Sequence, residues 1–428
     1  MKKFEKEAML EGNEKFEKAI SRIEKLYDPI YGDAPMRSEF DRDYTRIINC
    51  NAYRRLKHKT QVFFSPKNDH ICTRIEHVNL VESISNTIAN YLGLNAELTK
   101  AIAVTHDIGH SPFGHQGESI LSEIALREYG EKFWHAGNGI HYVDDLELLK
   151  DIAGNERNLN LTYAVRDGIL GHSGEPTISG QKPRNEFVDL KKFTHSNKYA
   201  PYTWEACVVK IADNISYLGR DLEDAKEMKL LTDRDLSNLD KMIENIRVNN
   251  TSIIGYLTAD LCKNSSVDVG LKFSDEAHST MERIKRFNYE KIYKNEKIQP
   301  TVRYFKVVMN EIFYTLKREY NGTATAKNIR KMKRYYPVLA NEFSNWLEKY
   351  SNAQDRDETK HFNKVIYDLN DIKDYSRAII DYMSGMTDQY IISVYDEIVK
   401  FYDIKWKKEW YKWYINMNQK VYVQCKWI

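Results

Sequence analysis

The stretch AIAVTHDIGHSPFGHQGE, residues 101–118, concentrates candidate functional side chains in a short part of the sequence. Its first half, AIAVTHD, is apolar up to a histidine and an aspartate, which predicts the buried end of a helix. Gly109 and Pro112 then interrupt this helix, and a second helix is expected to restart near Phe113. The candidate residues of the stretch are His106, Asp107, His110, His115 and Glu118.

The spacing within this stretch favours two kinds of chemistry. A His–Asp doublet at the end of an apolar helix is a suitable pair of metal ligands. His115 and Glu118 are three residues apart and share a helix face, so the glutamate can hold the histidine as a proton donor or base. An HD dipeptide alone is common and is often only a core histidine. The GHSPFGHQGE sequence that follows makes the functional interpretation the stronger one.

Composition limits the class of protein. The chain has 428 residues, of which 42% are hydrophobic and 29% charged, as in ordinary soluble globular proteins. Its net charge of +2 gives no overall bias toward nucleic acid or membrane, and no apolar run is long enough to predict a transmembrane helix. The start is too charged for a signal peptide. Five scattered cysteines without CxxC spacing predict a reduced, cytoplasmic protein.

Helical periodicity extends over most of the chain. Residues 1–30 are predicted to form a charged amphipathic helix. Residues 74–92 have apolar side chains at helical spacing, which places Arg74 and His77 one turn apart. The segment QVFF, residues 61–64, is short and β-prone, so we expect a strand or hairpin edge there. His135 and His141 are expected on a loop and at the start of the following helix.

Five arginines between residues 37 and 55 leave two interpretations open. They are Arg37, Arg42, Arg46, Arg54 and Arg55. One interpretation is a solvated basic face, and the other is a wall of phosphate donors. The residues themselves favour neither.

A further predicted helix, residues 204–228, supplies three more candidate residues. In WEACVVKIADNISYLGRDLEDAKEM, residues 204–228, Asp213, Tyr217 and Asp221 are spaced i, i+4 and i+8 and therefore line one face. Burying an aspartate costs free energy unless the carboxylate is paired or bound to a metal. Asp213 is therefore the natural fourth ligand of a metal ion. Before this helix, residues 173–203 read as a loop that follows His172. Near the end, Trp406, Trp410 and Trp413 are more typical of a core or subunit interface than of a base-stacking platform.

The order H…HD…D of His77, His106–Asp107 and Asp213 resembles the HD-domain metal phosphohydrolases. Five motifs, from Arg37 to Tyr390, look more specifically like the deoxyguanosine triphosphate triphosphohydrolase (dGTPase) family: RSEFDRDYTRIINCNAYRRLKHKTQVF, TRIEHVNLVES, THDIGHSPFGHQGE, ADNISYLGRDLEDA and DYMSGMTDQY. The resemblance implies an all-α fold: an HD-domain helical core with additional C-terminal helices and at most a short β-hairpin. We expect a helical lead-in at 1–36, a catalytic core at 37–230 and, at 231–428, a helical C-terminal region that completes the site and subunit contacts.

The resemblance also implies roles for individual residues. The implied metal ligands are His77, His106, Asp107 and Asp213. The implied catalytic residues are His115 with its partner Glu118, and His110, a position that is His in some relatives and Asn in others. The implied substrate-binding residues are Arg74 at the α-phosphate, Gln61, Tyr217 and Asp221 at the deoxyribose, and His135. The chain departs from the family pattern at AGNGIHYV, which leaves the roles of His135 and His141 open.

The activity implied is metal-dependent hydrolysis of a deoxynucleoside triphosphate, dGTP above all, to deoxynucleoside and inorganic triphosphate. It would use one divalent metal per chain, Mn²⁺, Mg²⁺, Fe²⁺ or Co²⁺. Relatives commonly form hexamers or tetramers, so a homo-oligomer is expected. A nucleotide effector or single-stranded DNA is a possible further partner. No membrane association is expected. Two alternatives stay open: an HD-domain phosphohydrolase with another nucleotide substrate, and a nucleic-acid-binding or regulatory protein with a vestigial site.

Overall fold

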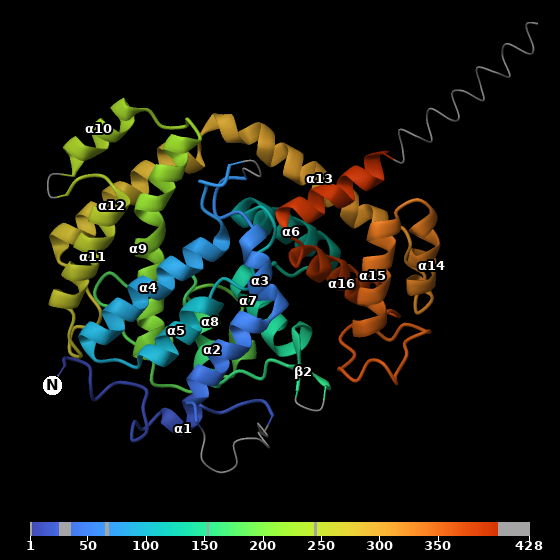
Figure 1. Cartoon of the computed structure of the whole chain (residues 1–428), viewed down its shortest axis with the longest axis horizontal. Coiled ribbons are helices and arrows are strands. Elements are labelled where there is room, and N and C mark those ends of the chain that lie inside the picture. The colour runs from blue at the N-terminus through green and yellow to red at the C-terminus, as the bar shows by residue number, and fades with distance from the viewer. Residues whose placement is uncertain (1, 25–35, 65–67, 152–153, 244–245, 401–428) are drawn as a thin grey trace, which may run out of the picture.

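The computed structural model describes residues 2–24, 36–64, 68–151, 154–243 and 246–400, and these residues form a largely helical protein (Figure 1). The predicted all-α class is confirmed. In the described part of the chain the one sheet is a hairpin of β1 (Leu148–Lys150) and β2 (Glu156–Asn158), paired antiparallel with Leu148 opposite Asn158. A short hairpin was the most that the sequence predicted.

The helix that ends at the HD doublet lies at the centre of the fold. This helix, α5 (Ala96–Thr105), begins where the side chain of Asn95 accepts hydrogen bonds from two backbone N–H groups of its first turn. Its last residues, Ala101 to Thr105, are completely buried because helices surround it. These neighbours are α2 (Glu39–Asn49), α4 (Arg74–Leu92), α8 (Tyr163–Gly171) and α9 (Trp204–Glu227). The HD doublet therefore lies where this helical core ends.

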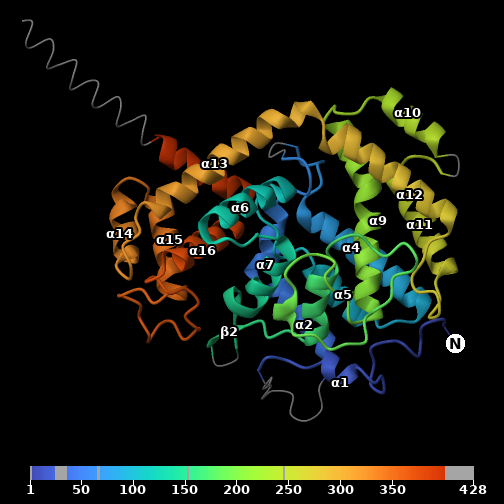
Figure 2. The same ribbon diagram turned by 180° about the vertical axis from the view of Figure 1, so that it is seen from behind.

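Two outer groups of helices flank the core, as Figures 1 and 2 show from opposite sides. One group packs on α9 and consists of α11 (Asn250–Asn264), α12 (Asp275–Asn288) and the π-helical turn η4 (Tyr289–Tyr293), with α10 (Asp233–Met242) against α12. The other group contains α6 (Gly114–Tyr129), α13 (Gln299–Lys317) and α16 (Ile372–Ser384), with α14 (Thr325–Lys331), η6 (Met332–Arg334) and α15 (Pro337–Tyr350) at one side. Long α13 connects the two groups.

Short elements connect these helices. They are α1 (Phe16–Ala19), α3 (Asn51–Arg55), η1 (Leu56–His58), α7 (His135–His141), η2 (Tyr142–Leu146), η3 (Leu190–Lys192) and η5 (Glu296–Ile298). Residues 388–400 are also helical, after a break at residues 385–387. Among the described helices, none has the length and apolar composition that a membrane crossing requires. The tryptophans predicted in a C-terminal helix lie outside the described residues.

The prediction of an amphipathic helix over residues 1–30 is wrong for the part described. Residues 2–24 are mostly turns, and α1 has only four residues. The cause is tertiary anchoring: Phe4 is buried against the Trp204 ring, and the backbone N–H of Met9 donates to the buried Glu205. Gly12, at a φ of +99°, then reverses the chain in a conformation that favours glycine.

The strand predicted at QVFF is also absent from the described residues 61–64. Only Thr60 pairs, in an isolated bridge with Thr73. The backbone carbonyls of Thr60 and Gln61 instead accept hydrogen bonds from the guanidinium of Arg74. Because a side chain satisfies these groups, no partner strand is needed.

Candidate active site

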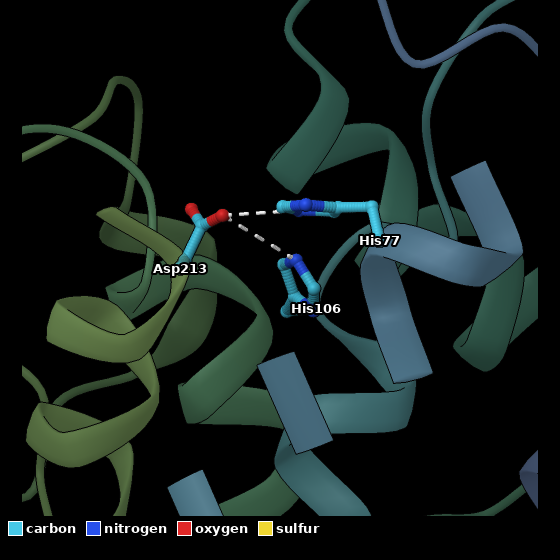
Figure 3. A group of neighbouring side chains, drawn as sticks. All are labelled: His77, His106 and Asp213. Atoms are coloured by element: carbon cyan, nitrogen blue, oxygen red, sulfur yellow. Dashed lines mark ion pairs between the residues drawn. The ribbon is translucent and has the colours of Figure 1, made fainter. Parts of the chain in front are cut away.

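Four side chains from three helices meet at the end of α5. Nε2 of His77 on α4 lies 3.1 Å from Oδ1 of Asp213 on α9, and Nε2 of His106 lies 3.9 Å from the same oxygen (Figure 3). Asp107 closes the cluster, with 3.5 Å from Oδ2 to Nε2 of His77 and 3.5 Å from Oδ1 to Nε2 of His106. The residues predicted as metal ligands are thus brought together.

Hydrogen bonds fix the orientation of both histidine rings. Nδ1 of His106 donates to the carbonyl oxygen of Ala103 at 2.7 Å. Nδ1 of His77 donates to Oγ of Ser216 at 3.2 Å, because the Ser216 hydroxyl itself donates to the carbonyl oxygen of Asp213. Both rings therefore direct Nδ1 away from the cluster and turn Nε2 toward it. Metal-binding histidines are commonly held in this way.

The cluster fits a divalent cation. Nε2 of His106 is buried and has no hydrogen-bond partner among the described residues, although it faces two carboxylates. A buried ring nitrogen that faces carboxylate oxygens without a hydrogen bond is unfavourable unless a cation or a bridging group lies between them. His77, His106 and Asp213 also offer ligand atoms within 4.8 Å of one another. Imidazole and carboxylate ligands without thiolates suit Mn²⁺, Fe²⁺, Co²⁺ or Mg²⁺.

Arg74 lies directly behind the cluster. Its guanidinium donates to Oδ2 of Asp107 at 2.7 Å, and it is almost completely buried. Burial alone raises the pKa of Asp107, but His110, His106 and Arg74 hold it well below its usual range. Asp107 is therefore a charged carboxylate with a fixed orientation. Arg74 also lines the adjoining cavity, as its predicted contact with a phosphate requires.

The carboxylate of Glu118 contacts two histidines, His115 and His135. The sequence predicts it as the partner of His115, and Oε2 lies 3.4 Å from Nδ1 of that residue, whose side chain is 70% exposed. Its contacts with His135 are shorter: the backbone N–H donates at 2.9 Å and Nδ1 at 3.0 Å. Burial lowers the pKa of His135, but Glu118 more than compensates and raises it. The His135 ring stacks on His110, with centroids 4.2 Å apart.

The positions expected for His135 and His141 are wrong. They form the first and last residues of one helix, α7, and not a loop followed by a new helix. This helix packs very close to the HD loop, because a Cβ at Gly109 would lie 2.2 Å from the backbone nitrogen of Gly139. Asn138 also donates to the carbonyl oxygen of Gly109 at 2.7 Å. Glycine at position 109 allows this approach, which brings His135 to Glu118.

A cavity of about 700 Å³ extends from the His/Asp cluster along α9. Tyr217 and Asp221 line it, as their spacing predicts, and so does Gln61. Oδ1 of Asp221 and Oε1 of Gln61 are buried acceptors without a hydrogen-bond partner among the described residues. Such atoms indicate a ligand that donates hydrogen bonds. Further along, Phe113 and Phe305 stack with ring centroids 3.8 Å apart and form an apolar wall.

The five arginines between residues 37 and 55 do not line this cavity. The interpretation as a wall of phosphate donors is therefore wrong for the cavity at the HD cluster. Arg55 instead forms an ion pair with Glu147 at 2.7 Å. Arg54 and Arg55 line a separate, basic cavity of about 620 Å³ with Lys57 and His58.

The C-terminal half contributes residues that the sequence did not single out. Asp388 accepts hydrogen bonds from the backbone N–H groups of Thr60, at 2.7 Å, and Phe113, at 2.9 Å. It thereby holds the Gln61 segment beside the start of α6, where Phe113 has a φ of +63°. Lys59 donates to the carbonyl oxygens of His110 and Ser384. Nothing in the local pattern around these residues indicates such contacts, because each partner is distant in sequence.

Comparison with known proteins agrees with this geometry. The HD domain family model matches residues 74–218, a range that contains all four predicted metal ligands. A deoxyguanosinetriphosphate triphosphohydrolase-like protein of Caldanaerobacter subterraneus subsp. tengcongensis is 33% identical over 85% of this chain and 85% of its own length. The chain belongs to this family of HD-domain proteins.

A relative of the same name from Desulfatibacillum aliphaticivorans is 35% identical over 65% of this chain and 73% of its own length. A third, from Rickettsia bellii, is 30% identical over 86% and 94%. Membership of the HD family makes the chain a phosphohydrolase.

Proposed function

We propose that this HD-domain protein hydrolyses a deoxynucleoside triphosphate, dGTP above all, to the deoxynucleoside and inorganic triphosphate. One observation carries the proposal: a single cavity joins the His/Asp cluster to Tyr217 and Asp221. Asp213 and Asp221 are two turns apart on α9, which is about 12 Å along the helix axis. A nucleotide with its α-phosphate at the cluster would lay its sugar along this face. The names of the relatives support the choice of dGTP.

We propose His77, His106, Asp107 and Asp213 as the ligands of one divalent ion. Such an ion, when bound, polarises a phosphoryl oxygen and lowers the pKa of a bound water. The charge of the cavity supports this part of the proposal. Among the described residues, its lining carries the carboxyl groups of Asp107, Glu175, Asp213 and Asp221 but only Arg74 and Lys297 as permanent cations, so an anionic triphosphate would meet net repulsion without an added cation.

The residues beside the cluster are suited to proton transfer. We assign His115 as the group that protonates the departing 5′ oxygen, because it is exposed at the cavity wall and can exchange protons with solvent. Glu118 orients both His115 and His135. His110 and His135 stack next to Asp107, and His110 donates from Nε2 to Oδ1 of that carboxylate at 3.0 Å. Arg74 fixes Asp107 and directs positive charge toward the α-phosphate.

The far end of the cavity suits a deoxyribose and a base. Asp221 and Gln61 each have an acceptor atom without a partner among the described residues, and it can receive a hydrogen bond from a 3′-hydroxyl. The Tyr217 ring can close against C2′ and leave no room for a 2′-hydroxyl. A buried hydroxyl without a partner would cost a ribonucleotide about 1–3 kcal/mol. Beyond the sugar, Phe64, Phe113 and Phe305 offer an apolar surface for a nucleobase.

Product analysis tests this function directly. The purified protein, loaded with Mn²⁺, is incubated with each of the four dNTPs and the products are separated by ion-exchange chromatography. We expect deoxynucleoside and inorganic triphosphate in equal amounts, at the highest rate from dGTP. Release of dNMP and pyrophosphate would contradict attack at the bond to the 5′ oxygen. Cleavage of none of the four dNTPs would favour an HD phosphohydrolase with another substrate.

A further inference from the structure

His172 is a buried histidine of the cavity to which the proposed mechanism gives no role. It is the residue that ends α8, and its side chain is only 2% exposed. Its Nε2 lies 4.0 Å from Oδ1 of Asp107, and its ring centroid lies 4.9 Å from that of His106 and 5.4 Å from that of His135. It therefore lies between the predicted metal ligands and the residues of proton transfer.

His172 repeats the construction of the predicted ligand His106. Each histidine ends a helix, α8 or α5, and these two helices pack against each other. Each Nδ1 donates, at 2.7 Å, to the carbonyl oxygen three residues earlier, that of Ile169 or Ala103. A backbone carbonyl only accepts, so Nδ1 of both rings carries a proton, and in the neutral ring Nε2 is the acceptor. His172 is thus held as firmly as a ligand histidine.

The loop after α8 is also fixed. Lys210 on α9 is buried, and its ammonium group donates to the carbonyl oxygens of Gly171, at 3.2 Å, and Ser173, at 2.7 Å. Its side chain also donates to Oδ1 of Asn197 at 2.7 Å. The carbonyls at a helix C-terminus have no partner within the helix, so these bonds satisfy groups that would otherwise need water. The backbone of His172 is therefore held rigidly on both sides.

The chemistry of Nε2 limits what it can bind. Because Nδ1 donates to the carbonyl oxygen of Ile169, the neutral ring presents Nε2 to the cavity as a hydrogen-bond acceptor. Phosphate oxygens do not donate at neutral pH, and the sugar hydroxyl is assigned to the Asp221 end of the cavity. Asp107 is also an acceptor. Two acceptors 4.0 Å apart can both be bonded by one water molecule, at the usual donor–acceptor distance of about 2.8 Å.

We propose that His172 positions the attacking water by accepting one of its hydrogen bonds at Nε2. This role rests on the proposed function. In the reaction, the water oxygen forms a bond to the α-phosphorus and the bond from phosphorus to the 5′ oxygen breaks. The water gives up one proton to solvent and keeps the other, and His115 supplies a proton to the 5′ oxygen. His172 takes no proton and is a positioning residue.

The test compares two substitutions of equal length, His172→Gln and His172→Met. Glutamine keeps an acceptor oxygen at the end of the chain, whereas methionine removes it with little change in volume. For each protein we measure bound Mn²⁺ by elemental analysis, the melting temperature, kcat and KM for dGTP, and the Kd of a dGTP analogue whose 5′ oxygen is a methylene. His195→Met, at an exposed histidine, is the control.

Loss of water positioning should reduce kcat and leave binding unchanged. We expect His172→Met to keep its metal and its affinity for the analogue while kcat falls roughly a hundredfold, the scale of a displaced reacting group. His172→Gln should recover part of this loss. Loss of Mn²⁺ from His172→Met would make His172 a ligand and overturn the proposal. Equal kcat values in His172→Met and His172→Gln would also overturn the proposal, even if the two variants differ in melting temperature.

The activity of the wild-type protein on the four dNTPs distinguishes failure of this proposal from failure of the function on which it rests. If it cleaves none of the four dNTPs, the proposed function fails and the role of His172 falls with it. If it cleaves dGTP and His172→Met does so equally fast, only the role of His172 is overturned.

Discussion

The phenol of Tyr293 donates a hydrogen bond to Oδ2 of Asp221, although 72 residues separate the two in sequence. Both side chains line the cavity. Tyr293 comes from η4, outside the segments that the sequence singled out, and it adds a residue to the end of the cavity where we propose that the sugar binds. Burial raises the pKa of Asp221 to about 7 despite this hydrogen bond. The structure thus keeps a carboxyl group where its charged form is unfavourable.

Replacing Asp221 by asparagine should stabilise the protein at high pH and reduce turnover. The ordinary pKa of an aspartate is 3.8, so the folded wild type loses stability as pH rises from 3.8 toward about 7. Asparagine removes this loss and also a charged acceptor for the 3′-hydroxyl. The free energy of unfolding in urea should therefore differ between the two proteins more at about pH 8 than at about pH 4. An equal difference at both pH values would contradict the raised pKa.

Removing one metal ligand should remove the metal. We expect about one divalent ion per chain in the wild type and a large loss in His106→Ala and in Asp213→Ala, because we propose each as one of four ligands and their side chains lie together. Elemental analysis of purified proteins measures this directly, and His195→Ala serves as the exposed-histidine control. Full occupancy in both variants would place the site elsewhere.

The ring of Tyr217 should decide between deoxyribose and ribose. Tyr217→Ala opens space beside C2′, so the ratio of kcat/KM for dGTP to that for GTP should fall by about ten- to a hundredfold, equivalent to a loss of 1–3 kcal/mol. Tyr217→Phe keeps the ring and should keep the ratio. If the ratio in folded Tyr217→Ala equals that of the wild type, Tyr217 is only a core aromatic.

Glu118→Gln should affect His135 as well as His115. The carboxylate raises the pKa of His135 against the effect of burial, so its removal should lower that pKa. NMR titration of histidine-labelled protein measures the change. An unchanged pKa of His135 in Glu118→Gln would show that the short contacts with Glu118 do not determine it.

His115→Ala should keep the bound metal and reduce kcat by about 10²–10⁴-fold, the usual contribution of a positioned proton donor.

His141 should stabilise the fold at neutral pH and lose this effect in alkali. Its ring lies between Asp145, at 2.9 Å, and Asp381, at 3.1 Å; burial lowers its pKa, but the two carboxylates raise it to about 10. The stabilisation is complete below the ordinary value of 6.5 and disappears as pH rises through about 10. His141→Gln should therefore cost about 1.5–3 kcal/mol at low pH and much less above pH 10. Urea unfolding at both ends of this range provides the comparison.

Local patterns predicted those parts of the site that lie within one helix or one loop. The spacing of Asp213, Tyr217 and Asp221 is a property of α9 alone, and the periodicity of residues 74–92 and 101–105 identified α4 and α5. The pairing of Glu118 with His115 followed in the same way. Its shorter contacts with His135 could not, because they depend on how closely Gly109 lets α7 approach.

Contacts between distant segments also explain the incorrect predictions. QVFF has the composition of a strand, but the backbone around it bonds to Arg74 and Asp388. The first residues have helical periodicity, but Phe4 and Met9 are anchored by residues near position 205. In both places tertiary contacts outweighed local propensity. His172 ends a predicted helix, yet only the packing of α8 against α5 shows that it faces Asp107.

The two hydrogen bonds that Asp388 accepts, from Thr60 and Phe113, bear on how the protein matures during translation. All four predicted metal ligands leave the ribosome well before Asp388 is made. At 5–20 residues per second, the stretch from Asp221 to Asp388 takes on the order of ten seconds or more to synthesise. Until then the start of α6, which carries His115, lacks its anchor. The nascent chain therefore passes through an interval in which all four proposed metal ligands have been made but Thr60 and Phe113 still lack the carboxylate that holds them.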